Sequence, residues 1–245
     1  WGQTKIDKAS VYFDKIVLVN NPQFAGVVAT TPAPTPEPLP DGKAGTTRYV
    51  EEDFEKTDKI GGAAKDNKIT IEEKDGNHYL QILKTGETDG HYDLSIKNTT
   101  RYVVVSVDAA STKFPQSDAQ LITCKYNGGQ HTFVYLNSKG EITANGKVAG
   151  TMKDNGKFVN VAIAGDFING KYDVYIDGKK KLENLTFGSG SGTVTPPTLY
   201  RAFMGAGSDD CANIMIDNLK IFDGLTPDDY KNTISAEESE SKNFS

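Results

Sequence analysis

The sequence has little tryptophan, cysteine or histidine. Of its 245 residues, one is Trp, two are Cys and three are His. The two cysteines, Cys124 and Cys211, allow either one disulfide or two buried thiols. Neither the cysteines nor the histidines have the spacing of a zinc site. The low counts therefore exclude a disulfide-rich scaffold and a Cys/His metal centre.

Two other features are absent: a basic charge balance and a long apolar run. The formal net charge is −6, which argues against nucleic acid as a partner because phosphate binding needs a basic surface. No run approaches the ~20 apolar residues of a membrane span, and no stretch has the pattern expected of a signal peptide. The sequence also lacks a Gly-x-Ser-x-Gly elbow, a phosphate-binding loop and a dinucleotide fingerprint. Uncharged sugars and Ca²⁺ remain compatible with the acidic balance.

A proline-rich stretch divides the chain. Five of the ten prolines fall within residues 29–45, ATTPAPTPEPLPDGKAG, a composition that favours an extended, semi-rigid linker. Linkers of this Pro/Thr type separate the modules of secreted proteins. The chain begins with Trp1 and not with Met, so we expect it to be a processed product or a piece of a larger protein. We predict a segment at 1–28, a linker at 29–45, a folded unit at 46–224 and a polar tail, either a short surface helix or frayed, at 225–245.

The folded unit has the pattern of an all-β protein. Short runs such as RYVVVSVDA, HTFVYLN and KYDVYIDGKK alternate apolar and polar residues, and turn dipeptides such as Asp75-Gly76 and Asp177-Gly178 separate them. No run keeps a helical period. Many short strands without helices between them predict a two-sheet antiparallel β-sandwich, a jelly roll. The alternation places Val103, Val105 and Val107 in its core.

Several motifs, in their order along the chain, resemble a known family. EEDFE, GNHYLQI, RYVVVSVD, KFVNVAIAGDFINGKYDVYIDGKK and NIMIDNLKIFDG are together similar to concanavalin A-like jelly rolls of the laminin-G-like type. The resemblance covers residues 48–223. It implies an extracellular, non-catalytic module that binds carbohydrate or mediates adhesion, attached to a larger secreted or cell-surface protein.

The first segment repeats the last predicted strand. VYFDKIVLVN aligns without a gap to IMIDNLKIFD, with Asp14 on Asp217. We interpret it as the closing strand of a preceding, related unit. Because an isolated strand cannot fold and a long apolar edge invites pairing, we expect residues 1–28 to dock as an extra strand, either on the same chain or on another subunit of a homo-oligomer.

The acidic stretch VEEDFE allows three interpretations. Glu51, Asp53 and Glu55 alternate, so on a strand they share one face, as in the catalytic strand of jelly-roll glycosidases. The intervening Glu52 and the absence of Trp from the unit argue against hydrolysis and favour a solvated acidic strand. The third interpretation is a structural Ca²⁺ that ties the first and last strands together, as in many jelly rolls that this chain resembles. Its ligands would be Asp53, Glu55 and Asp217.

Sugar binding needs aromatic faces and polar groups that reach hydroxyls. The strand faces turned away from the predicted core supply candidates of both kinds, although each of them also fits an ordinary strand surface. The loop at Asn127–Gln130 is an alternative site. The candidate ligand-binding residues are His91, Asp93, Tyr102, Lys125, His131, Tyr135 and Tyr175.

The sequence thus predicts a non-catalytic carbohydrate-binding module whose partners are a polysaccharide or glycan and the neighbouring modules of its own polypeptide. A different class remains open, a structural or adhesive module that assembles through protein contacts and strand exchange. A glycoside hydrolase using Glu51 and Glu55 is the third and least favoured interpretation.

Overall fold

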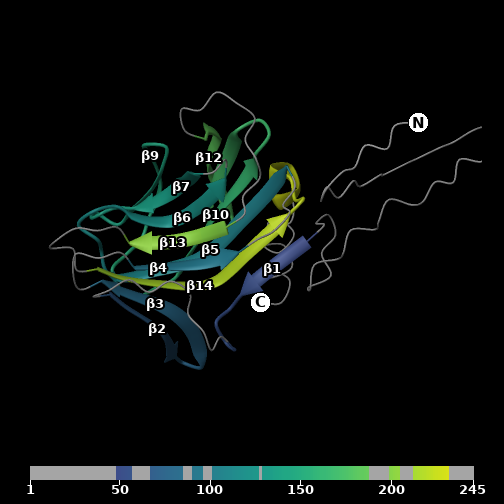
Figure 1. Cartoon of the computed structure of the whole chain (residues 1–245). Helices are drawn as coiled ribbons and strands as arrows, with labels where there is room; N and C mark the ends of the chain where they lie inside the picture. The colour runs from purple at the N-terminus through teal and green to yellow at the C-terminus, as the bar shows by residue number, and fades with distance from the viewer. Residues whose placement is uncertain are drawn as a thin grey trace, which may run out of the picture. The chain divides into compact units, whose positions relative to one another are not determined.

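The structure is a computed structural model that describes residues 48–56, 67–84, 90–95, 101–126, 129–187, 199–204 and 212–231. All of them belong to the second of the two units into which the chain divides, residues 36–245. The predicted docking segment 1–28, the linker 29–45 and Cys211 lie outside the described residues. Within the described ranges, two antiparallel sheets face each other (Figure 1), which confirms the predicted β-sandwich.

The larger sheet is built around two long central strands. Its order is β12-β11-β10-β5-β14-β3-β2, and β1 pairs with β14 beside β3. The central strands β5 and β14 are twelve residues each. The bounds are β1 Arg48–Glu52, β2 Asn67–Lys74, β3 Asn77–Lys84, β5 Tyr102–Lys113, β10 Val159–Asp166, β11 Lys171–Ile176, β12 Lys179–Thr186 and β14 Ala212–Asp223.

The smaller sheet has the order β4-β13-β6-β7-β8-β9. Its strand β13 returns from the far end of the chain and inserts between β4 and β6. The bounds are β4 Gly90–Ser95, β6 Ala119–Tyr126, β7 Gly129–Leu136, β8 Glu141–Ala144, β9 Lys147–Thr151 and β13 Leu199–Met204.

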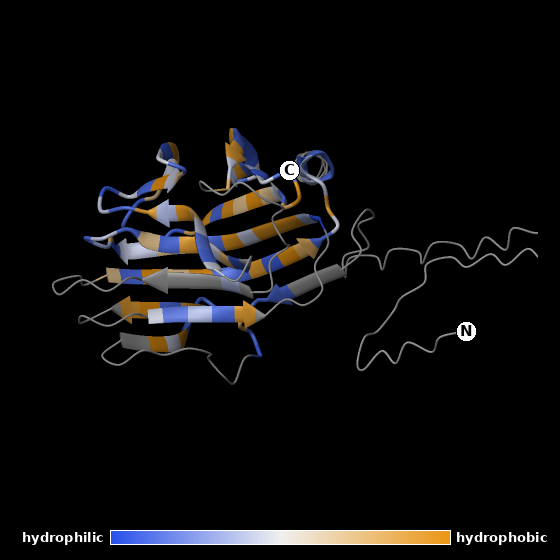
Figure 2. Ribbon diagram, turned by 45° about the horizontal axis from the view of Figure 1, so that its top comes forward, coloured by the Kyte–Doolittle hydropathy of each residue, from blue (hydrophilic) through white to orange (hydrophobic). Residues whose placement is uncertain are grey.

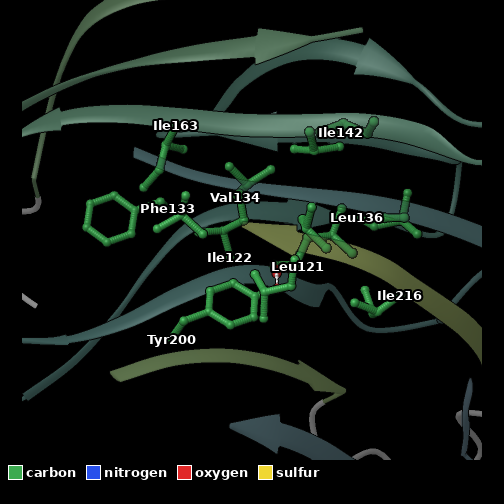
Figure 3. Close-up of a cluster of buried hydrophobic side chains, with 14 of the residues drawn as sticks. Leu121, Ile122, Phe133, Val134, Leu136, Ile142, Ile163, Tyr200 and Ile216 are labelled. Atoms are coloured by element: carbon green, nitrogen blue, oxygen red, sulfur yellow. Dashed lines mark hydrogen bonds between the residues drawn. The ribbon is translucent and has the colours of Figure 1, made fainter. Parts of the chain in front are cut away.

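The core lies between the sheets and follows the predicted alternation. Val103, Val105 and Val107 of β5 are fully buried in it, as are residues of β10 and β11. Figure 2 shows hydrophobic and hydrophilic residues alternating along the strands. Figure 3 shows how side chains from both sheets meet, among them Ile163 and Ile216 from the larger sheet and Val134, Leu136 and Tyr200 from the smaller. Burial of this apolar surface is the main driving force for closing the sandwich.

Cys124 belongs to this core. It is fully buried and its thiol is free. Burial raises the pKa of Cys124 to about 12, because a thiolate would be poorly solvated there. The thiol therefore stays protonated and serves packing rather than chemistry.

A second hydrophobic cluster lies on the outer face of the larger sheet. Here Tyr230 and Leu225 cover Val104, Ala162 and Tyr175. Residues 225–231, which we predicted as the start of a polar tail, therefore pack on the sandwich. A helical turn spans residues 227–231, and Figure 1 draws it as the short yellow coil. The predicted short helix is therefore present, and its Tyr230 ring lies edge-on to the Tyr175 ring at 5.0 Å.

Two-residue turns with left-handed backbone join several of the strands. Asp75 and Gly76 join β2 to β3, and Asp177 and Gly178 join β11 to β12, all with positive φ. Asn145 and Gly146 join β8 to β9 in the same way. Asn, Asp and Gly tolerate this conformation best, which is why these dipeptides mark hairpins.

Two glycines with almost the same φ provide a test of packing at the turns. Gly140 has φ 74° and Gly146 has φ 73°. A Cβ at Gly140 would lie 2.5 Å from Phe114 Cζ and 2.6 Å from the Met152 carbonyl oxygen, whereas one at Gly146 would meet no atom within 4 Å. We expect Gly146→Ala to lower the free energy of unfolding by about 1 kcal/mol, from backbone strain alone. Gly140→Ala should cost a further ~1–3 kcal/mol through overpacking.

Chemical denaturation of the two variants, compared with the parent chain, measures this difference. Equal losses of stability at the two positions would contradict the packing of Phe114 and Met152 around Gly140.

Candidate functional site

Five of the seven predicted ligand-binding residues lie in the smaller sheet, but they do not form one group. His91 and Asp93 lie in the edge strand β4, and β13 separates this strand from β6, which carries Lys125. The His91 and Asp93 side chains approach each other, with Nε2 4.0 Å from Oδ2. His131 and Tyr135 lie further along the sheet in β7. Among the described residues, this last pair borders one common hollow.

A bulge in β7 changes the face on which His131 lies. Ile122 of β6 is opposite Val134, but the next residue, Thr123, is opposite Thr132, so Phe133 is an extra residue in β7. Counting every second residue from Tyr135 would put His131 on the outer face. The register instead places it opposite Cys124, a core residue. The prediction that both side chains share the outer face is therefore wrong for His131.

An open hollow of about 500 Å³ lies beside the first part of β7. We call it the β7 hollow. Strand β8 pairs with β7 only through Tyr135–Thr143 and Leu136–Ile142, so the described part of β8 leaves the preceding stretch of β7 uncovered. The lining residues are Gln120, Gln130, His131, Thr132, Phe133, Tyr135, Asn145, Gly146, Tyr172, Thr186 and Phe187. They come from both sheets and from the β8–β9 turn.

Packed aromatic rings support the hollow from below. The Phe133 ring contacts the rings of Tyr172 and Phe187 edge-on, with centroid distances of 5.1 and 5.0 Å. The ring centroids of Phe167 and Phe187 are 4.6 Å apart. The Tyr172 hydroxyl donates to the Phe133 carbonyl at 3.4 Å. Edge-to-face contacts of this kind add to the stabilisation from burial. The bulged part of β7 is therefore held against a rigid base.

Polar groups surround this base. Gln120 is opposite Tyr135 across the β6–β7 pair, and Asn145 lies at the tip of the hairpin. The side-chain oxygen Oε1 of Gln120 accepts from the Thr123 hydroxyl at 3.1 Å, which holds the Gln120 amide beside Tyr135. None of the described residues that line the hollow is Asp or Glu. Amides, an imidazole and a phenol can exchange hydrogen bonds with hydroxyl groups, but they include no carboxylic acid pair for hydrolysis.

Sequence reasoning missed Gln120 and Asn145 and included Gln130 only through the loop alternative. Asn127 and Gly128 of that loop lie outside the described residues. Asn145 carried a recognisable signal, because Asn-Gly is the strongest short hairpin marker. Nothing in the sequence indicated that this hairpin tip lies near β7 and β12.

Tyr175 and Tyr102 lie in the other sheet. Tyr175 is 1% exposed, covered by Tyr230, and its hydroxyl donates to the Pro227 carbonyl at 3.2 Å. The expectation that Tyr175 offers an accessible aromatic face is therefore wrong, because the segment after β14 covers it. Tyr102 is half-buried at the start of β5 and borders a second hollow, described below.

The acidic stretch does not form a row of carboxylates on one strand. Strand β1 ends at Glu52, and Phe54 has φ 59°, so the backbone turns before Glu55. Glu51 lies opposite Lys220 and pairs with its ammonium at 3.3 Å. Glu55 instead accepts from the His78 backbone N–H at 3.0 Å and contacts Nδ1 of the same histidine at 2.8 Å. The geometry expected of a glycosidase strand is absent from this stretch.

The three carboxylates considered for calcium have separate partners. Asp53 accepts from the Glu55 backbone N–H at 3.2 Å. Asp217 accepts from the Asn77 amide at 2.9 Å and from the Asn218 backbone N–H at 2.7 Å. Among the residues that the structure describes, no three His, Cys, Asp or Glu side chains form a group that could hold a metal. Calcium binding by Asp53, Glu55 and Asp217 stays a prediction that this arrangement does not support.

Comparison with known proteins identifies the fold. No family model and no curated protein matches the chain. A solved sialidase is 14% identical, with a TM-score of 0.53, over 75% of this chain and 19% of that one. A Trypanosoma rangeli sialidase in complex with the inhibitor DANA is 13% identical, with a TM-score of 0.51, over 78% of this chain and 33% of that one.

At these identities the likeness shows a shared β-sandwich and says nothing of activity. The chain spans only a fifth to a third of the sialidase chains it matches. The finer assignment to the laminin-G-like type rests on the sequence motifs alone. No helix in the described part of the chain is long and apolar enough to cross a membrane.

The buried carboxyl of Asp217 should make the stability of the fold depend on pH. Burial raises the pKa of Asp217 above its ordinary value of 3.8, and the nearby carboxylates of Asp108 and Glu55 act in the same direction. The folded state therefore binds a proton more tightly than the unfolded state does. The contribution of Asp217 to the free energy of unfolding is therefore greatest below pH 3.8, the pKa in the unfolded chain. It falls as the pH rises from there through the higher pKa of the folded state.

Asp217→Asn removes this titration. We expect the stability of the variant relative to the parent to improve as the pH rises through this window and then to level off. Denaturation curves between about pH 3 and pH 7 measure the effect. A difference that stays constant across the range, or that moves in the opposite direction, would contradict the burial of a charged Asp217.

Proposed function

We propose that this chain is a non-catalytic carbohydrate-binding β-sandwich, a module of a larger secreted or cell-surface protein, and that it binds a polysaccharide or glycan in the β7 hollow. The chemistry of this hollow is the observation that carries the proposal. Amide, imidazole, phenol and hydroxyl groups surround a base of packed rings, and this rim suits the hydroxyl groups of a sugar.

The non-catalytic part of the proposal follows from the carboxylates. Glycoside hydrolysis ordinarily needs two of them across the scissile bond, about 5–10 Å apart. The described lining of the β7 hollow contains no Asp or Glu, and Glu51 and Glu55 are engaged with Lys220 and His78. This site therefore supports binding without bond cleavage.

The form of the hollow favours a sugar unit or a chain end over a flat crystalline surface. Flat polysaccharide surfaces are bound by exposed planar rings, and the unit contains no Trp. The rings beneath the hollow are almost fully buried, with Phe133 at 2% and Tyr172 at 3% exposure. The rim supplies most of the accessible contacts, so hydrogen bonding to hydroxyls provides most of the specificity.

The base of the site is also packed before a ligand arrives. Its base is part of the core cluster, and the Asn145–Gly146 turn that forms part of its rim is of a well-defined type. Side chains that are already ordered lose less conformational entropy on binding. The extracellular setting is proposed from the Pro/Thr-rich linker and from the resemblance to laminin-G-like modules.

The proposal predicts that removing one rim amide weakens sugar binding. Asn145 has φ 48°, so Asn145→Gly keeps the turn while deleting the amide. In calorimetric titrations with a neutral oligosaccharide selected on a glycan array, we expect the affinity to fall about 2- to 10-fold, the equivalent of one hydrogen bond.

Asp75→Gly is the matched control. Asp75 is the first residue of a similar turn, with φ 57°, and it does not line the hollow. We expect this variant to bind like the parent chain. Equal affinities for Asn145→Gly and the parent, or no binding across plant, host and microbial glycans by folded protein, would contradict the proposal.

A further inference from the structure

A second hollow lies on the outer face of the larger sheet. It has a volume of about 550 Å³ and is bordered by the start of β5, the end of β10, the β11–β12 hairpin and the segment that begins at Thr226. We call it the Tyr102 hollow, after the aromatic residue at its edge.

The hollow exists because a small residue, Ala164, lies between larger side chains on the outer face of the sheet. Ala164 of β10 is opposite Val104 on one side and Asp173 on the other, so these three side chains share the outer face. Two pairs further along, and so on the same face, Tyr102 is opposite Asp166. Because the Ala164 side chain is only a methyl group, a space remains above it, between the side chains of Tyr102 and Asp173.

The wall opposite β12 is the segment after β14. Thr226 caps the helical turn: its hydroxyl accepts from the Asp229 backbone N–H at 3.1 Å and donates to the Asp229 carboxylate at 2.6 Å. Thr226 therefore occupies the N-cap position, with Pro227 at the first helical position. The bond from the Tyr175 hydroxyl to the Pro227 carbonyl fastens the wall to the sheet.

The polar groups around the hollow are held in place by their own partners. Asp166 accepts two hydrogen bonds from the Arg101 guanidinium, at 2.8 and 2.6 Å, and two more from the backbone N–H groups of Ile168 and Asn169. These bonds, above all those from Arg101, lower the pKa of Asp166 and keep it ionised. The Arg101 guanidinium also lies 4.8 Å from the centre of the Tyr102 ring, which fixes that ring beside the hollow.

The β12 side is equally ordered. Asp173 accepts from the Lys180 ammonium at 2.5 Å and from the Asn184 backbone N–H at 2.9 Å. The register of β11 and β12 shifts at this point, and Asn184 has φ 53°. The irregularity positions the Asn184 side chain along the rim of the hollow.

The charges around the hollow select the class of ligand. Four carboxylates line it, those of Asp166, Asp173, Glu183 and Asp228, together with the ammonium groups of Lys171 and Lys180. With the Arg101 guanidinium that Asp166 holds, one negative charge remains in excess. An anionic ligand would be repelled by this excess. An uncharged polyhydroxyl ligand can instead accept from the amide and ammonium groups, donate to the fixed carboxylates and lie against the Tyr102 ring.

We propose that the Tyr102 hollow is a second saccharide site, which has Tyr172 in common with the β7 hollow, and that it selects uncharged sugars. The class of ligand rests on the proposed function, whereas the location and the selectivity for uncharged sugars rest on the contacts described here. With two sites, one module can hold two points of a polysaccharide chain or two chains, which raises the apparent affinity for a polymer over that for a short oligosaccharide.

Residue-resolved NMR titration separates the two sites. The probes are neutral tetrasaccharides of β-1,4-glucose, β-1,3-glucose, β-1,4-xylose and β-1,4-mannose, with sialyllactose as the anionic comparison. The side-chain amides of Asn169 and Asn184 report on the Tyr102 hollow, and those of Gln120 and Asn145 report on the β7 hollow. We expect a neutral probe to shift both groups of signals, and sialyllactose to leave Asn169 and Asn184 unchanged.

Two glycine substitutions then test whether the sites are independent. Asn184→Gly and Asn145→Gly each replace an asparagine of positive φ, so each removes one amide while the backbone keeps its conformation. We expect Asn184→Gly to weaken binding at the Tyr102 hollow about 2- to 10-fold and to leave the shifts at Gln120 unchanged. We expect Asn145→Gly to weaken binding at the β7 hollow and to leave the shifts at Asn169 and Asn184 unchanged.

Each outcome decides between the two proposals. Shifts confined to Gln120 and Asn145 would overturn the second site and leave the proposed function intact. Shifts confined to Asn169 and Asn184 would support the second site and move the proposed function away from β7. Sialyllactose shifts at Asn169, or unchanged affinity in Asn184→Gly, would overturn the selective second site. No shift with any probe would overturn both proposals.

Discussion

The pairing of β14 with β5 and β3 holds the larger sheet together. β14 lies between strands from the first half of the described chain, and β1 extends its edge. A bulge interrupts β14 between Asp217 and Lys220, where Asn218 has φ 46°. The Asn218 amide donates to Asp108 of β5 at 3.0 Å, and Asn160 of β10 donates to the same carboxylate at 2.8 Å. A one-residue slip of β5 against its two neighbours would break both hydrogen bonds and turn the core face of β5 outward.

Both candidate sites depend on this fixed register. The β7 hollow opens beside residues of β11 and β12, and these strands are joined through β10 to the same central pair. The Tyr102 hollow lies directly on β5 and β10, and its wall is the segment that follows β14. Each hollow also lies next to an irregularity, the Phe133 bulge in one case and the register shift beside Asp173 in the other. Regular pleating alone would have left flat faces.

The sequence predicted the strands that are buried on one or both faces and missed those that are short. The period-two pattern of β5 predicted the core residues Val103, Val105 and Val107 correctly. Strands β8 and β9 have four and five residues, too few for a clear alternation, and β13 was not predicted. For the sites, alternation identified Tyr102 and Tyr135 as outward residues but failed for His131, because a bulge leaves no reliable signal in the pattern.

By itself, then, the sequence determined the two-sheet sandwich, most of its core and the positions of its turns, because period-two patterning and left-handed Asn, Asp and Gly turns are local properties. Only the tertiary structure decided which polar residues meet. It covered Tyr175 with Tyr230 and brought Asn145 beside β7, since these contacts join segments that are far apart along the chain. Long-range packing sets them, and neither composition nor spacing records which strand will lie next to which.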